Sequence, residues 1–130
     1  MQQSKKWLDE KNYNKFSQIF SCENEQDILA EFFFLISNFL AVDNNFKKSN
    51  FYSNISNYLN PKFYFNLTHL ISNYNENKNY EQTKDLLENF NKEEEIYYWY
   101  KLKKVAQIID DEQGPNESLL YIEKKFNLLY

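Results

Sequence analysis

Residues 67–87 read LTHLISNYNENKNYEQTKDLL, and this stretch decides the fold. Its first part spaces apolar residues three or four positions apart, and its last part does the same after the polar residues 75–79. Such spacing places apolar side chains on one face of a helix. Asn-rich segments favour turns, because Asn tolerates left-handed backbone conformations. The stretch therefore predicts two amphipathic helices joined by a short turn.

The pair Asn79-Tyr80, which opens the second of these helices, recurs along the chain. Equivalent pairs are Asn12-Tyr13, Asn45-Phe46 and Gly114-Pro115, whose second members follow one another at 33, 34 and 35 residues. Helical stripes stand before three of the pairs: Phe33, Ile36, Ser37 and Leu40; Leu67, Leu70, Ile71 and Tyr74; Leu102, Val105, Ala106 and Ile109. Others follow all four pairs, for example Phe16, Ile19 and Phe20. The spacing therefore predicts a structural repeat in which each unit consists of two helices joined by a turn.

This pattern resembles the tetratricopeptide repeat. In that family the first helix carries a large apolar, a small and an aromatic residue, a Tyr follows at the turn, and a Pro closes the second helix. Ser37 and Ala106 occupy the small position here, whereas Ile71 departs from it. Pro61 stands where the closing Pro belongs, and Glu95 replaces it one unit later.

The resemblance covers about residues 28–130 and implies an all-α fold of stacked antiparallel helical hairpins with about seven helices. A compact helical bundle is the alternative. We expect one helical-repeat domain over 1–130, with 1–25 as an N-terminal cap or partial repeat and 28–61, 62–95 and 96–130 as repeat units. Helices are predicted near 5–20, 26–42, 46–59, 62–76, 80–91, 94–110 and 116–129, with a turn over Asp111 to Pro115.

Composition argues against several classes of function. The net charge of −4 and pI of about 5.1 disfavour a nucleic-acid binder, which needs a basic surface to displace counterions. Cys22 is the only cysteine, so an intramolecular disulfide and a thiolate zinc site are excluded. The polar N-terminus leads into no signal-like apolar segment, and the stretch Ile28–Val42 is too short and too interrupted for a bilayer. We expect a cytoplasmic protein with no membrane partner.

Few residues could support catalysis, so we expect a protein that is not an enzyme and holds no cofactor or metal. His69 is the only histidine, and acid–base or metal chemistry needs convergent partners. Cys22 would need a base or an electropositive setting to react. The acidic runs 93–95 and 110–112 lack the Gly-containing spacing of a calcium loop and fit helix ends and turns. A single Gly leaves no glycine-rich phosphate loop.

The family binds peptides in a groove lined by the first helix of each unit. Carried over to this chain, the resemblance implies groove positions with amide side chains that can hold a peptide backbone and aromatic rings that offer apolar pockets. These positions are Glu31, Phe34 and Asn38; Phe65, Thr68, Ser72 and Asn75; and Tyr100, Lys103, Gln107 and Asp110.

Three hypotheses for function follow. The first is a non-catalytic, regulatory binding module that captures a peptide or protein in this groove, similar to the repeat domains of bacterial and phage peptide-sensing regulators. The second is a small phage or mobile-element inhibitor that blocks a host enzyme by surface binding. The third is a nucleic-acid-associated protein, favoured only if Lys47, Lys48, Lys101, Lys103 and Lys104 converge on one face. Exposed aromatic residues also make self-association possible.

Overall fold

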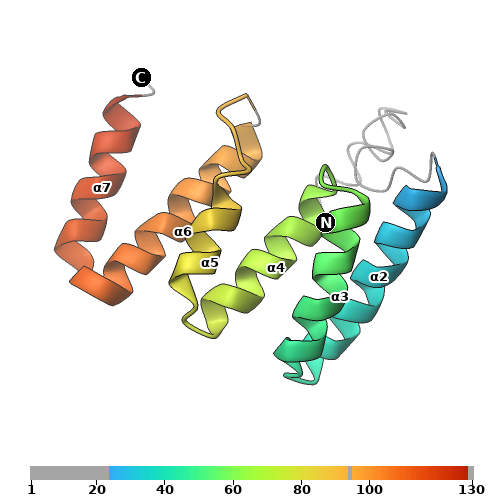
Figure 1. Ribbon diagram of the computed structural model, residues 1–130. Coiled ribbons are helices and arrows are strands. Elements are labelled where there is room, and N and C mark those ends of the chain that lie inside the picture. The colour runs from blue at the N-terminus through green and yellow to red at the C-terminus, as the bar shows by residue number, and fades with distance from the viewer. Residues whose placement is uncertain (1–23, 94, 129–130) are drawn as a thin grey trace, which may run out of the picture. The chain divides into compact units, whose positions relative to one another are not determined.

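The protein is helical throughout the residues that its computed structural model describes, 24–93 and 95–128 (Figure 1). The helices are α2 (Glu25–Val42), α3 (Phe46–Leu59), α4 (Tyr64–Glu76), α5 (Tyr80–Leu87), α6 (Glu95–Gln113) and α7 (Pro115–Asn127). No strand occurs within those two ranges. The all-α prediction is confirmed with six helices, and the seventh, predicted over 5–20, lies outside the described residues, as do Trp7 and Cys22.

The predicted bounds of α2, α3 and α4 agree with the structure to within two residues, whereas α5 and α6 differ more. Helix α5 ends at Leu87, before the predicted residue 91. The reason is that Phe90 turns inward and its ring stacks on that of Tyr97, with 5.2 Å between the ring centroids. Helix α6 continues to Gln113 through residues predicted as a turn. The chain leaves the helix only at Gly114, whose φ of 100° suits glycine. The predicted turn over Asp111 to Pro115 is therefore confined to Gly114, and the prediction was wrong for Asp111 to Gln113, which are helical.

Two of the turns between helices have the same backbone geometry. After α2, the N–H of Asn44 donates to the carbonyl of Ala41 and that of Asn45 to Leu40, each at 2.9 Å. After α4, Lys78 donates to Asn75 and Asn79 to Tyr74, also at 2.9 Å. Asn44 and Lys78 both have φ of 56°. This pair of hydrogen bonds around one left-handed residue is the Schellman motif, which satisfies the last carbonyls of a helix.

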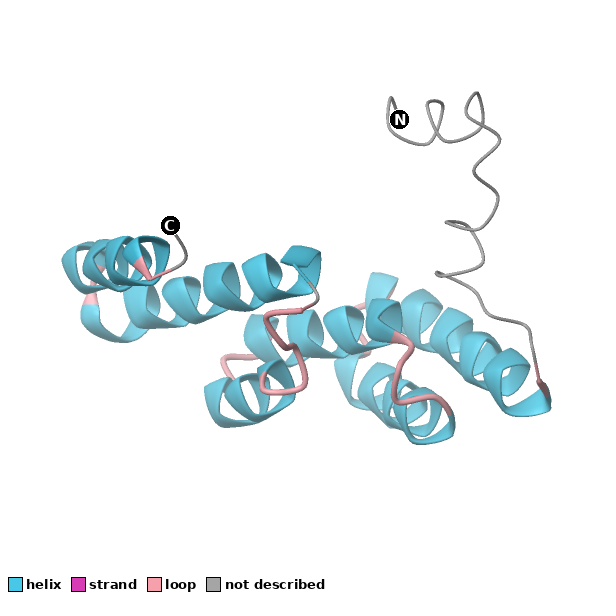
Figure 2. Cartoon of the chain, turned by 90° about the horizontal axis from the view of Figure 1, so that it is seen from above, coloured by secondary structure: helices cyan, strands magenta, loops and turns pink. Residues whose placement is uncertain are grey.

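The chain forms two compact units, one ending at Asn73 and one beginning at Tyr74, and the division falls in the last turns of α4. In the first unit, α2 and α3 form a hairpin (Figures 1 and 2). Its interior holds small side chains that let the two helices approach closely. They are Ala30, Ser37, Ser49, Ser53 and Ser56, all fully buried.

Helix α4 joins this hairpin through both apolar and polar contacts. The ring of Phe63, just before α4, meets Phe34 edge-on at 5.2 Å. Asn66 on α4 is fully buried and exchanges two hydrogen bonds with Ser53 on α3, with donor–acceptor distances of 2.6 and 2.9 Å. Pairing both groups satisfies polar atoms that would otherwise be costly to bury.

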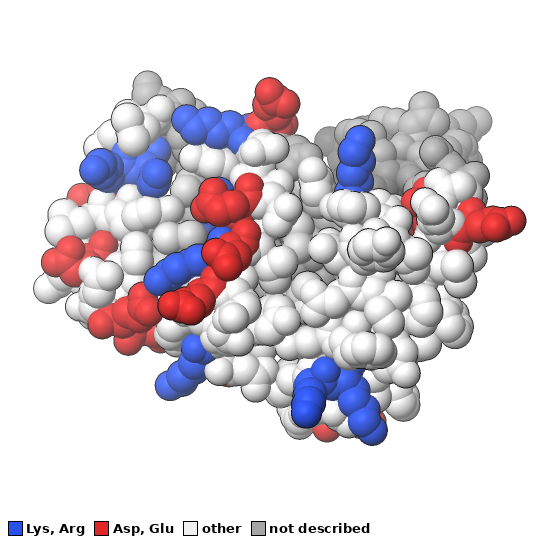
Figure 3. Space-filling model, in the orientation of Figure 1, with Lys and Arg blue, Asp and Glu red and all other residues white. Residues whose placement is uncertain are grey.

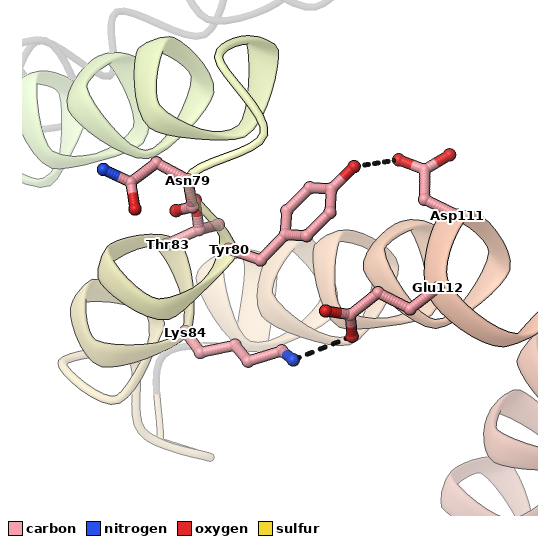
Figure 4. Close-up of polar contacts among 6 residues, drawn as sticks. All are labelled: Asn79, Tyr80, Thr83, Lys84, Asp111 and Glu112. Atoms are coloured by element: carbon pink, nitrogen blue, oxygen red, sulfur yellow. Dashed lines mark hydrogen bonds and ion pairs between the residues drawn. The ribbon is translucent and has the colours of Figure 1, made fainter.

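The second unit contains the end of α4 and the helices α5, α6 and α7, and α6 and α7 form its hairpin (Figures 1 and 2). The Ser118 hydroxyl on α7 donates to the carbonyl of Ala106 on α6 at 2.8 Å. Helix α5 is tied to the last turn of α6 by two contacts between exposed side chains (Figure 4). The Tyr80 hydroxyl donates to Asp111 at 2.8 Å, and the Lys84 ammonium pairs with Glu112 at 3.0 Å.

Candidate functional site

One predicted groove residue of the first unit is part of the core instead. Phe34 is only 3% exposed, and its ring makes edge-on contacts with Phe63, Phe65 and His69. The reason is that Phe34 lies on the same face of α2 as Ala30 and Ser37, four residues before it and three after it, and that face packs against α3 and α4. The prediction of Phe34 as a groove contact was wrong.

The other predicted residues of the first unit lie on α2 and α4 with varied exposure. Asn38 is exposed, whereas Glu31, Thr68 and Ser72 are half-buried. Phe65 is 48% exposed and touches Phe34 with its ring at 5.8 Å. The Thr68 hydroxyl is engaged locally, since it donates to the Phe65 carbonyl at 2.9 Å. The assignment of these five residues as groove contacts remains a prediction.

In the second unit, a pocket of about 270 Å³ opens between α6 and α7. Its lining is mainly apolar. Three of its lining residues were predicted as groove contacts: Lys103, Gln107 and Asp110. The remaining lining residues are Trp99, Leu102, Ala106, Ser118 and Ile122. Sequence reasoning missed Trp99 and Ile122 as site residues.

Local sequence explains why a pocket forms at this place. Ala106 and Ser118 are small, and the hydrogen bond between them holds α7 against α6. Trp99, Lys103, Ala106 and Asp110 follow one another at three or four residues and therefore share one face of α6. That spacing is visible in the sequence and could have identified Trp99, whereas Ile122 joins the site only through the packing of α7.

Tyr100 and Asn75 do not join this pocket. The Tyr100 ring meets Phe90 edge-on at 6.0 Å, and the Lys104 ammonium lies 5.8 Å from its centre. Burial lowers the pKa of Lys104, and the charge of Glu76 opposes this effect. Asn75 lies half-buried in the last turn of α4. Tyr100 therefore packs around Phe90 and not beside Lys103 and Gln107.

A second pocket, of about 400 Å³, lies among α5, α6 and α7, and it is lined by charged and phenolic groups. Lys101 pairs with Glu88 at 2.9 Å, and the Lys125 ammonium lies 5.6 Å from the centre of the Tyr121 ring. Burial raises the pKa of Tyr121. Lys84 and Lys101 are both paired with carboxylates, and the Lys125 ammonium lies over the Tyr121 ring. Because these groups already have partners and the lining of the α6–α7 pocket is mainly apolar, the α6–α7 pocket is the better candidate.

His69 belongs to a buried polar cluster that joins α2, α3 and α4, the helices described in the first unit. Its Nε2 lies 3.1 Å from the Ser37 hydroxyl and 3.4 Å from that of Ser49, which also accepts a hydrogen bond from Asn73 at 2.7 Å. The Ser37 hydroxyl donates to the Ser49 carbonyl at 2.8 Å, so its oxygen is left to accept from its neighbours. Burial lowers the pKa of His69, and a hydrogen bond with the Ser37 backbone opposes this. Ser37 and Ser49 are fully buried, so the cluster stabilises the fold.

Charged side chains are concentrated over α5–α7, and the visible face of α2–α4 is largely uncharged (Figure 3). The acidic run 110–112 lies in the last turns of α6, and Asp111 and Glu112 engage Tyr80 and Lys84. Within 24–93 and 95–128, no group of three or more His, Cys, Asp or Glu side chains is arranged to hold a metal ion. Lys101 and Lys103 line different pockets of α6, so they do not form one basic patch.

Comparisons with protein-family models, with curated proteins and with solved structures find no match to this chain. Among the helices described, none combines the length and the apolar character needed to cross a membrane. Any functional assignment must therefore come from the geometry of the two units.

Proposed function

We propose that this chain is a non-catalytic module that binds an extended peptide, or an exposed segment of a partner protein, at the pocket between α6 and α7. One apolar side chain of the ligand enters the pocket, and the ligand backbone lies along the exposed side of α6. The observation that carries the proposal is an apolar pocket with Lys103, Gln107 and Asp110 among its lining residues. The scaffold in this proposal is a tetratricopeptide-like stack of hairpins, which is supported by the repeated Schellman turns.

The size of the pocket favours a side chain over a larger ligand. Sites for drug-sized molecules and cofactors span roughly 300–1,000 Å³. A pocket of about 270 Å³ is smaller and suits one large apolar side chain. Trp99 and Ile122 would contact that side chain, and contacts of this kind supply most of the affinity in protein interfaces.

The polar residues around the pocket would fix the register of the ligand. Gln107 can donate to a peptide carbonyl and accept from a peptide N–H. Lys103 and Asp110 are exposed and seven residues apart on α6, so about 10 Å separates them along the helix axis. We therefore expect ligands in which an acidic residue and a basic residue flank the apolar anchor.

Trp99 allows a direct test of this proposal. A Trp7→Phe protein keeps Trp99 as its only indole, because the chain has two tryptophans. Peptides selected from a random displayed library should change the emission of Trp99 on binding. The substitution Gln107→Ala should lower the affinity for these peptides about three- to tenfold. Lys124→Ala, on the exposed side of α7 and outside the pocket lining, is the matched control and should change affinity less than twofold.

Selected peptides that leave Trp99 emission unchanged and bind Gln107→Ala as tightly as the parent protein would contradict the proposal. They would place the binding surface elsewhere. The first-unit residues Glu31, Asn38, Phe65, Thr68 and Ser72 would then be substituted next.

A further inference from the structure

The pocket of about 400 Å³ in the second unit gathers charged and phenolic groups from three elements. Each element contributes residues three or four positions apart, which therefore share one face of a helix. Helix α5 with its C-terminal cap supplies Lys84 and Glu88, α6 supplies Tyr98 and Lys101, and α7 supplies Tyr121 and Lys125. Sites for small molecules span roughly 300–1,000 Å³, so this pocket has room for a ligand of its own.

Positive charge exceeds negative charge around this pocket. Its lining contains three lysines and one carboxylate, that of Glu88. A second carboxylate, Glu112, pairs with Lys84 from outside the lining (Figure 4). Among the residues that the structure describes, no carboxylate pairs with Lys125, whose ammonium lies over the Tyr121 ring. An anion that enters the pocket would therefore meet an uncompensated positive charge.

The ion pair between Lys101 and Glu88 can exchange its carboxylate for another anion. The Lys101 side chain is only 16% exposed, whereas that of Glu88 is 77% exposed. Glu88 can turn into water at little cost, because most of its side chain is already solvated. The more buried Lys101 ammonium then needs another anionic partner. A dianion would compete well for it, because a double charge attracts a cation about twice as strongly at the same distance.

Two phenols add uncharged donors beside these ammonium groups. Tyr98 and Tyr121 are half-buried, and neither hydroxyl has a hydrogen-bond partner in the described part of the chain. Burial raises the pKa of Tyr121, and nearby Tyr98 and Glu88 add to this effect. The Tyr121 hydroxyl therefore stays protonated at neutral pH and can donate to an anionic oxygen. Leu102 and Val105 complete the lining with apolar surface.

We propose that this pocket binds a phosphate monoester, with the phosphoryl group among Lys101, Lys125 and Tyr121 and the carbon atoms of the ester against Leu102 and Val105. A phosphoryl group carries nearly two negative charges at neutral pH and has three strongly accepting oxygens. It can replace Glu88 beside Lys101 and accept from a phenol at the same time, which a carboxylate does less well. The ester is either a free small molecule or a phosphorylated side chain, and both present the same chemistry. This site does not depend on the peptide site, with which it shares only Leu102.

Calorimetric titration of the full chain with phenyl phosphate tests the proposal, and we expect saturable binding to the wild-type protein. Glu88→Gln removes the carboxylate that competes for Lys101, so it should tighten binding about three- to tenfold. Glu123→Gln is the matched control, because it removes the same charge from the exposed side of α7, outside the pocket lining. It should change the affinity less than about twofold.

A second pair of variants tests the cationic side of the site. Lys125→Met keeps the aliphatic part of the side chain, removes its charge and should weaken the binding of phenyl phosphate at least about fivefold. Lys124→Met, which is exposed on α7 and outside the lining, should change the affinity less than about twofold. Phenyl sulfate has a similar shape but a single negative charge, and it should bind at least about fivefold more weakly than phenyl phosphate.

A tripeptide with a central phosphotyrosine distinguishes the two sources of the ester. Tighter binding of the tripeptide than of phenyl phosphate supports the site as one for a modified protein, and weaker binding supports it as one for a free ester. The proposal would be overturned if phenyl phosphate showed no saturable binding up to about 10 mM. Equal effects of Glu88→Gln and Glu123→Gln, with unchanged circular dichroism, would also overturn it, because they would show attraction by net charge alone.

Discussion

Asn44 and Lys78 stand 34 residues apart and have the same left-handed backbone conformation, with φ of 56° at each. Each lies two residues beyond the end of a helix, and its N–H and that of the following residue donate the same two kinds of backbone hydrogen bond. The sequence period therefore has a physical counterpart, since the same turn is built twice at the spacing that the repeat predicts. Asn accepts this conformation readily, whereas Lys does so at a cost.

Replacing Lys78 should relieve that cost. We expect Lys78→Gly to raise the free energy of unfolding by about 0.5–1 kcal/mol, because glycine adopts positive φ without strain. Urea denaturation monitored by circular dichroism measures the change. Lys48→Gly is the control: Lys48 is exposed within α3, and glycine there should destabilise the protein by about 1 kcal/mol. Equal destabilisation by both changes would argue against strain at Lys78.

Ser53 and Ser56 on α3 give a matched pair for buried hydroxyls. Ser53 is hydrogen-bonded to Asn66, whereas the Ser56 hydroxyl has no partner in the described part of the chain. We expect Ser53→Ala to cost about 1–3 kcal/mol, because it leaves the buried Asn66 oxygen without its donor. Ser56→Ala should be neutral or stabilising by up to about 1 kcal/mol. Thermal unfolding of both proteins measures the difference, and a similar loss in each would contradict it.

The buried position of His69 predicts a pH dependence of stability. Burial lowers its pKa in the folded state below the ordinary value of 6.5, so the folded protein binds its proton more weakly than the unfolded chain does. The contribution of neutral His69 is therefore fully present above pH 6.5 and is lost as pH falls below that value. Denaturant titrations between pH 7.5 and about pH 5 should show this loss in the wild-type protein. A His69→Gln protein that loses stability just as steeply would contradict the assignment.

Two ion pairs of the second unit should differ in strength. Lys101 is only 16% exposed beside Glu88, whereas Lys84 and Glu112 are 46% and 38% exposed. Glu88→Gln leaves a poorly solvated ammonium without its partner, and we expect a loss of about 1 kcal/mol. Glu112→Gln should cost less than about 0.5 kcal/mol, because water can replace the contact. Equal losses in chemical denaturation would show that the burial of Lys101 has no energetic effect.

Much of the fold could be predicted from sequence because its helices are amphipathic and its turns repeat. The bounds of α2, α3 and α4 follow from apolar spacing and from the Asn residues at their ends. The ends of α5 and α6 could not be predicted, because they depend on tertiary contacts. Phe90 packs against Tyr97, and the acidic end of α6 is held by Tyr80 and Lys84.

The candidate site could be predicted only in part. Lys103, Gln107 and Asp110 were predicted as groove positions because the family resemblance assigns such positions to the first helix of each unit, and all three line the α6–α7 pocket. The same rule failed at Phe34, where the core of this protein uses that face of α2. Ile122 could not be predicted as a site residue from the sequence, because no local pattern shows which residue of α7 faces the gap beside Ala106.

The affinity of a selected peptide for two variants of α7 tests the central claim most directly. Ile122 lines the pocket, and Leu120, two residues earlier, does not line it and is 58% exposed. We predict that Ile122→Glu weakens binding by at least about tenfold, because it places a carboxylate in an apolar site, and that Leu120→Glu changes affinity less than twofold. Equal affinities of both variants and the wild-type protein, with unchanged circular dichroism, would contradict binding at the α6–α7 pocket.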